Sequence, residues 1–150
     1  QVVDELGKLS VKKVLILEPG FKINTIKLRT RQDYYRCLGE NRELTSQAFK
    51  KLKYGIENDH MESIRQACET SALANENIKN TPHLRDLIEL ARECDYEFLN
   101  ISHTGTALGI GLGDRTDIER LEYEIRNSEI SKVYKRQYVK NIIDGGLRRR

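Results

Sequence analysis

Three hydroxyl side chains, one imidazole and one glycine stand together in the segment Ser102-His103-Thr104-Gly105-Thr106. Gly105 tolerates a positive φ, and this conformation aims successive backbone N–H groups at one point, forming a nest for an anion. The hydroxyl groups add hydrogen-bond donors, and His103 can add a proton or a positive charge. The segment therefore predicts a binding site for a phosphate or a carboxylate, and the residue types do not distinguish the two.

The same five residues also fit a tight hairpin turn whose Ser and Thr side chains hydrogen-bond their own backbone. A single glycine-containing turn is a weak motif, so residue types alone leave both interpretations open. His103 beside Ser102 is adjacency in the sequence and does not indicate a catalytic triad. We therefore assign no catalytic residue within this chain.

Apolar residues flank the turn on both sides and predict two strands that it connects. These residues are Tyr96, Phe98, Ile101, Ala107, Leu108, Ile110 and Leu112. The apolar run within 11–18 predicts another buried strand, and the alternation over 132–140 predicts a strand at or near a sheet edge. Pro19-Gly20 is a turn signal, after which 23–28 is expected to form a strand that pairs with the first as a hairpin.

Helix starts are marked by capping residues or by a proline at the first helical position. We expect these starts at Thr30, Thr45, Asp59, Thr81 and Thr116. The helix that begins at Thr30 is expected to end at Gly39. The resulting order is strand, strand, a block of helices, strand, strand, helix and strand. This order predicts a single α+β domain over 1–150, with helices packed on one face of a largely antiparallel sheet.

The bulk composition limits the class of protein. Charged residues make up 33% and hydrophobic residues 38%, and the net charge is +3, most of it in the last three arginines. We find no basic stripe with interleaved aromatic residues and no apolar run near ~20 residues, so we expect neither a nucleic-acid nor a membrane partner. Cys37, Cys68 and Cys94 are odd in number and lack metal-ligand spacing, which predicts reduced cysteines in a cytoplasmic protein without a metal site.

Two segments together carry a family resemblance: 15–25, with the sequence LILEPGFKINT, and 102–109, with the sequence SHTGTALG. From about Val11 to Asp144 the chain resembles the C-terminal half of GHMP kinases. It is most similar to the L-threonine kinase branch tied to cobalamin synthesis and propanediol utilisation. The resemblance matches Asn24-Thr25 to an Asp/Asn-Thr pair, and it matches 102–106 to a Ser-His-Ser/Thr-Gly-Ser/Thr turn.

The resemblance implies a ferredoxin-like sandwich that forms the substrate-side domain of a two-domain kinase. ATP and Mg would be bound mainly by an N-terminal kinase domain that these 150 residues do not contain, so the chain alone is expected to be inactive. Its partners would be that N-terminal domain and a small-molecule substrate with a hydroxyl group. The substrate-binding residues that the resemblance implies are Asn24, Thr25, Ser102, His103, Thr104, Gly105 and Thr106.

Two other functions remain open at this point. The chain contains no Gly-x-x-x-x-Gly-Lys motif and no glycine–serine phosphate loop before a helix, which also fits a free-standing module that senses an amino acid or a small anion. The predicted edge strand at 132–140 supports a further hypothesis, a homodimer formed through that strand.

Overall fold

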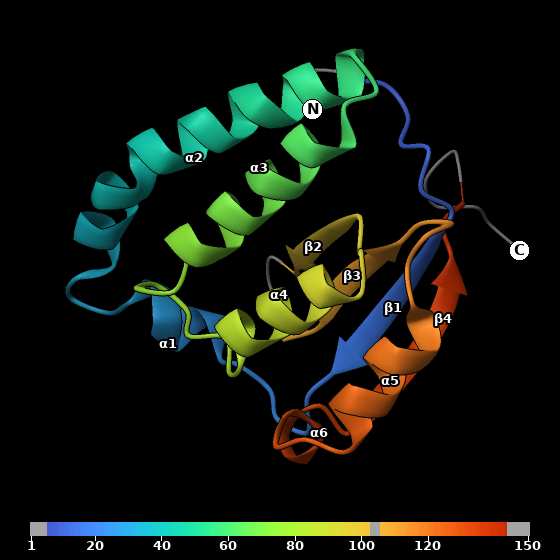
Figure 1. The fold of residues 1–150 in the computed structure, drawn as a ribbon. Coiled ribbons are helices and arrows are strands. Elements are labelled where there is room, and N and C mark those ends of the chain that lie inside the picture. Colours follow the sequence, from blue (N-terminus) through green and yellow to red (C-terminus); the bar gives the residue numbers. More distant parts are fainter. Residues whose placement is uncertain (1–5, 103–105, 144–150) are drawn as a thin grey trace, which may run out of the picture.

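The computed structural model describes residues 6–102 and 106–143 as an α+β domain (Figure 1). Its elements, in chain order, are β1 (Lys13–Glu18), α1 (Thr25–Arg29), α2 (Tyr34–Glu57), α3 (Met61–Ala74), α4 (Leu84–Glu93), β2 (Phe98–Ile101), β3 (Leu108–Leu112), α5 (Ile118–Arg126), α6 (Ile130–Val133) and β4 (Arg136–Asn141). The predicted fold class is therefore confirmed. No helix in the described ranges is long and apolar enough to cross a membrane.

The sheet has the strand order β2-β3-β1-β4, and every neighbouring pair is antiparallel. β1 lies in the middle, where Leu15 is paired with Ile110 of β3 on one side and with Val139 of β4 on the other. This strand order, with helices between β1 and β2 and between β3 and β4, is that of the ferredoxin-like sandwich. The expected strand near 132–140 is accordingly an edge strand, although it begins only at Arg136.

One face of the sheet carries the main hydrophobic core. Alternate residues of the strands point to this face, and α4 and α5 lie across it (Figure 1). The buried side chains contributed by the strands and these two helices are Leu15, Leu17, Leu99, Leu108, Ile110, Leu112, Leu84, Leu87, Ile88, Ala91, Leu121 and Ile125. Since burying one such aliphatic side chain stabilises the fold by about 1.5–3 kcal/mol, this face supplies most of the hydrophobic stabilisation.

Helices α2 and α3 form an antiparallel pair, with α3 lying between α2 and β2 (Figure 1). Gly55 lets the two helices approach, because a Cβ atom there would lie 2.7 Å from Cγ1 of Ile64. A second, smaller core joins α3 to the other face of the sheet through Ile64, Cys68 and Phe98. Phe98 lies over Gly111 of the neighbouring strand, where a Cβ atom would come within 2.5 Å of its ring. Together, α2 and α3 extend the domain beyond the edge of the sheet that β2 forms (Figure 1).

A buried carboxylate connects α3 to α4 and to the segment before β2. Glu69 of α3 is 5% exposed and accepts hydrogen bonds from the guanidinium of Arg92 and from the hydroxyl of Tyr96. Arg65, one turn earlier in α3, lies over the Tyr96 ring with its Cζ 5.2 Å from the centroid. Burial raises the pKa of Glu69, but the hydrogen bonds from Arg92 and Tyr96 outweigh it, and the net pKa is below the ordinary value.

The predicted strand at 23–28 is wrong, because this segment forms the short helix α1. The Asn24 side chain accepts from the backbone N–H groups of Ile26 and Lys27 at 3.1 and 3.0 Å, and this capping favours the helix over a strand. The predicted break at Gly39 is also wrong, since Gly39 lies inside α2, which is one continuous helix of 24 residues. Thr45 caps nothing, because it lies inside α2 and its hydroxyl donates to the carbonyl of Asn41 at 2.9 Å.

The other predicted helix starts are displaced by one to three residues. The N-cap of α2 is Asp33, three residues after the predicted start at Thr30. His60, and not Asp59, caps α3 by accepting from the N–H of Ser63. α4 begins after His83, which adopts a left-handed conformation with φ 58°. Asp117 caps α5, because the Thr116 hydroxyl is occupied by the backbone of Asp95 and Gly113.

We predict that Glu69→Gln destabilises the domain at pH 7 by about 1.5–3 kcal/mol, because it weakens hydrogen bonds to a buried charged group. The pKa of Glu69 is lower in the folded state than its ordinary value of 4.5, so its contribution is complete above about pH 4.5 and is lost as the pH falls through the folded pKa. Urea unfolding of both proteins at pH 7 and pH 3 measures the effect.

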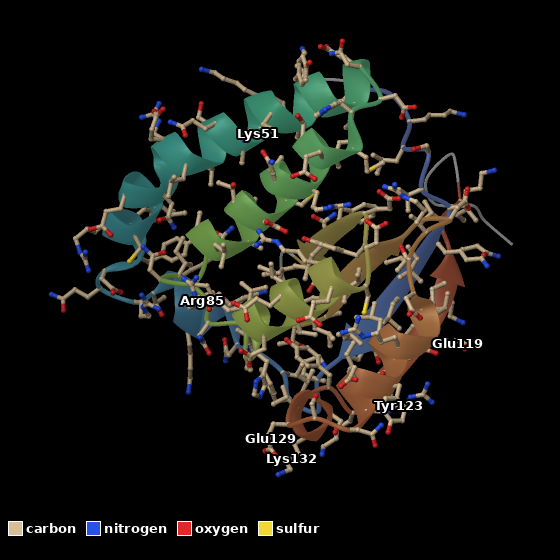
Figure 2. The ribbon with its side chains drawn as sticks, viewed as in Figure 1. Lys51, Arg85, Glu119, Tyr123, Glu129 and Lys132 are labelled. Carbon is tan, nitrogen blue, oxygen red and sulfur yellow. The ribbon has the colours of Figure 1, made fainter. Side chains whose placement is uncertain are left out.

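Glu129→Gln is the matched control, because Glu129 and its partner Lys132 lie at the surface (Figure 2) and their ion pair is exposed. We expect this control to change the free energy of unfolding by less than about 0.5 kcal/mol. Equal unfolding free energies for Glu69→Gln and the unsubstituted chain at pH 7 would contradict the stabilising role of the buried carboxylate.

Candidate functional site

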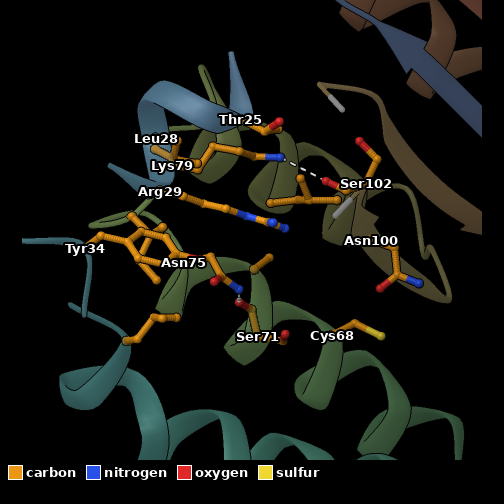
Figure 3. Close-up of a pocket in the computed structure, with 14 residues that line it drawn as sticks. Thr25, Leu28, Arg29, Tyr34, Cys68, Ser71, Asn75, Lys79, Asn100 and Ser102 are labelled. Atoms are coloured by element: carbon orange, nitrogen blue, oxygen red, sulfur yellow. Dashed lines mark hydrogen bonds between the residues drawn. The ribbon is translucent and has the colours of Figure 1, made fainter. Parts of the chain in front are cut away.

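A cavity of about 240 Å³ lies where α1, the start of α2, the C-terminal half of α3 and the end of β2 meet (Figure 3). Thr25 and Leu28 line it from α1, Ser71 from α3, Asn75 from the C-cap of that helix, and Ser102 from the position directly after β2. The Asn75 side chain donates to the backbone carbonyl of Ser71 at 2.7 Å, which fixes the last turn of α3 against this space. Residues far apart in the sequence thus form one concave surface.

The two segments predicted to bind substrate meet at this cavity. Thr25 and Ser102 both line it, and the Thr106 hydroxyl donates to the backbone carbonyl of Phe21 at 3.2 Å. The N–H of Ser102 donates to the carbonyl of Ala107 at 2.9 Å, which continues the β2–β3 pairing past the strand ends. The Ser102 Oγ is buried and makes no hydrogen bond within the described part of the chain.

Of the four predicted residues that the structure describes, Thr25 and Ser102 line the cavity, whereas Asn24 and Thr106 do not. His103, Thr104 and Gly105 lie outside the described residues, so their roles in anion binding stay predictions. Asn24 is not part of the cavity lining, and its side-chain oxygen is used by two N–H groups of α1. Asn24 therefore positions Thr25 by starting the helix, and a direct contact with substrate stays a prediction.

Two cations that the sequence analysis did not single out line the same cavity. Arg29, the last residue of α1, extends across it toward the side of Asn100 and Ser102 (Figure 3). The ammonium group of Lys79 donates to the backbone carbonyl of Ser102 at 2.9 Å. Burial lowers the pKa of Lys79 while Glu76 opposes this effect. No Asp or Glu is among the described residues that line the cavity, so its charge is positive and suits an anion.

The signal that would have revealed Arg29 is its spacing from Thr25. In a strand, residues four apart are separated by about 13 Å, whereas in a helix they lie about 6 Å apart on one face. Assigning 23–28 to a strand therefore separated two residues that α1 places at one cavity. Lys79 has no such signal, because it lies in the irregular connection between α3 and α4.

A second cavity of about 220 Å³ lies beside the first, and the two share Cys68, Ser71 and Asn100. Its remaining walls are mostly apolar and include Ala48 and Phe49 of α2. Burial raises the pKa of the Cys68 thiol to about 11, so the thiol is protonated at neutral pH and is a poor nucleophile. The residues that line the second cavity are therefore suited to binding and positioning a ligand and not to nucleophilic attack.

Comparison with known proteins gives two matches. The chain is 26% identical over 141 residues to the L-threonine kinase of Salmonella typhimurium (strain LT2) and 23% identical over 126 residues to the L-threonine kinase of Citrobacter freundii. The matches cover 90% and 80% of this chain but only 45% and 43% of the two relatives, so the chain spans less than half of their length. The resemblance to L-threonine kinases is thereby confirmed.

No family model matches the chain. No solved structure matches it significantly.

We predict that the chain binds inorganic phosphate at this cavity and that Arg29→Gln and Lys79→Gln each weaken binding by about tenfold. Such a loss corresponds to about 1.4 kcal/mol, the size expected for one charge-assisted hydrogen bond to an anion. NMR titration of backbone amides with phosphate measures the affinity. The control is Arg85→Gln, since Arg85 lies on the exposed side of α4 (Figure 2). Equal phosphate affinity in all variants would rule out an anion site at this cavity.

Proposed function

We propose that this chain is the C-terminal, substrate-side domain of an ATP-dependent kinase of the GHMP type. The reaction is transfer of a phosphoryl group to the hydroxyl of L-threonine, which yields O-phospho-L-threonine for cobalamin synthesis and links the enzyme to propanediol utilisation. The observation that carries the proposal is the match of 80–90% of the chain to two L-threonine kinases. The GHMP assignment rests on the two sequence motifs.

The charge of the cavity supports the proposal. Phosphoryl transfer depends on positioning and on neutralising negative charge more than on covalent chemistry by the protein. The acceptor carries a carboxylate, and the transferred group carries several negative oxygens, so both are attracted by Arg29 and Lys79. The hydroxyl of Thr25 and the amide of Asn100 line the same space and provide neutral hydrogen-bonding groups for the amine and hydroxyl of the acceptor.

In this proposal the N-terminal kinase domain supplies ATP, Mg and the catalytic base, and the cavity closes against that domain. The described cavity lining contains no carboxylate, a side chain that commonly serves as a Mg ligand or as a general base. The chain alone is therefore expected to bind an anion without turning over ATP.

The proposal predicts that a protein comprising the N-terminal domain and this chain phosphorylates L-threonine in preference to homoserine, mevalonate and sugars. Arg29→Gln in that protein should raise the KM for L-threonine by about tenfold, because it removes one charge-assisted contact. The chain alone should show no turnover under the same conditions. Transfer of labelled phosphate from ATP measures both results.

Two outcomes would contradict the kinase assignment. One is measurable kinase activity of the 150-residue chain by itself. The other is a two-domain protein that phosphorylates none of the four acceptors while the chain still binds L-threonine or phosphate, a result that would favour the anion-sensing module.

A further inference from the structure

Arg31 occupies the turn between α1 and α2, and its guanidinium reaches the connection between α3 and α4. One terminal nitrogen donates to the carbonyl of Ile78 at 2.9 Å, and the other donates to the carbonyl of Asn77 at 3.0 Å. Asp33 accepts from the remaining edge of the guanidinium, with distances of 2.7 Å from Nε and 2.9 Å from Nη2. All three guanidinium nitrogens therefore have a partner.

The two carbonyl groups that accept from Arg31 belong to Asn77 and Ile78, which are the residues directly before Lys79. A second contact fixes the same connection, because the side-chain amides of Asn41 and Asn77 donate to each other at 2.8 and 3.3 Å. Asn41 is buried within α2, so this contact anchors the connection to the long helix. The position of the Lys79 backbone is thus set by α2 and the turn before it, and the Lys79 ammonium group then reaches Ser102.

We infer that Arg31 is a positioning residue that holds Lys79 at the anion-binding cavity. This inference deepens the proposed function and rests on it where substrate is concerned. A planar guanidinium can donate to two adjacent carbonyls and a carboxylate at once, whereas the lysine ammonium is a single point charge without that fork. Arg31→Lys therefore keeps the charge and loses the paired contacts with the carbonyls of Asn77 and Ile78. The connection then keeps its side-chain contact with Asn41.

The location of the Arg31 side chain distinguishes it from a residue that only stabilises the fold. Its side chain is 39% exposed, and it belongs to neither hydrophobic cluster. Replacing it should leave the melting temperature of the chain within a few degrees of the original while changing the surroundings of Lys79. A matched control is Arg85→Lys, which makes the same substitution on the exposed side of α4.

The first test follows the Lys79 side chain by NMR during a pH titration of the 150-residue chain. Burial holds the pKa of Lys79 below its ordinary value of 10.5. We expect Arg31→Lys to move this pKa up toward 10.5 as the side chain becomes hydrated, and Arg85→Lys to leave it unchanged. An unchanged Lys79 titration in a folded Arg31→Lys variant would overturn the positioning role.

The second test uses the two-domain kinase. Arg31→Lys should raise the KM for L-threonine by about tenfold and leave kcat within about twofold, because the contact that weakens is with bound substrate. A lower kcat with unchanged KM would also overturn the inference. If the unsubstituted kinase phosphorylates none of the acceptors, the proposed function fails, while the Lys79 titration still decides the role of Arg31.

Discussion

The buried carboxylate of Glu69 is the interaction on which the shape of the functional region depends. It holds α3 against α4 and against Tyr96 at the start of the β2 segment, so that the α2–α3 pair is fixed beyond the sheet edge. Removing a hydrogen-bond partner of a buried carboxylate is costly, and this cost makes the orientation of α3 specific. Because α3 forms one wall of both cavities, the geometry of the candidate site follows from this contact.

The main core and the candidate site use different physical forces. α4 and α5 cover one sheet face with aliphatic side chains, which supply stability without polar specificity. The cavity at the end of β2 is bordered by segments from four parts of the chain, and hydrogen bonds to backbone carbonyls hold two of them together. Arg29 and Lys79 give the cavity lining positive charge in a partly enclosed space, and such a space favours an anionic ligand.

The sequence predicted the elements whose apolar periodicity is long or regular. The capping signal at Thr81 placed the start of α4 to within a few residues, and the apolar residues Leu108, Ile110 and Leu112 placed β3. It failed at 23–28, where three apolar residues fit either structure and the capping side chain of Asn24 decided for a helix. Lys79 could not be predicted as a site residue, because its position depends on contacts made by Arg31 from a distant segment.

The place of β1 in the middle of the sheet has a consequence for how the chain is made. β1 lies near the start of the chain, but both of its hydrogen-bonded neighbours, β3 and β4, lie in the last third. The backbone N–H and C=O groups along both edges of β1 therefore stay unpaired during synthesis until β3 and β4 have left the ribosome, whereas the α2–α3 hairpin can form from local contacts earlier. Nascent chains of this domain should accordingly depend on chaperones that shield an exposed strand during the interval before β4 emerges.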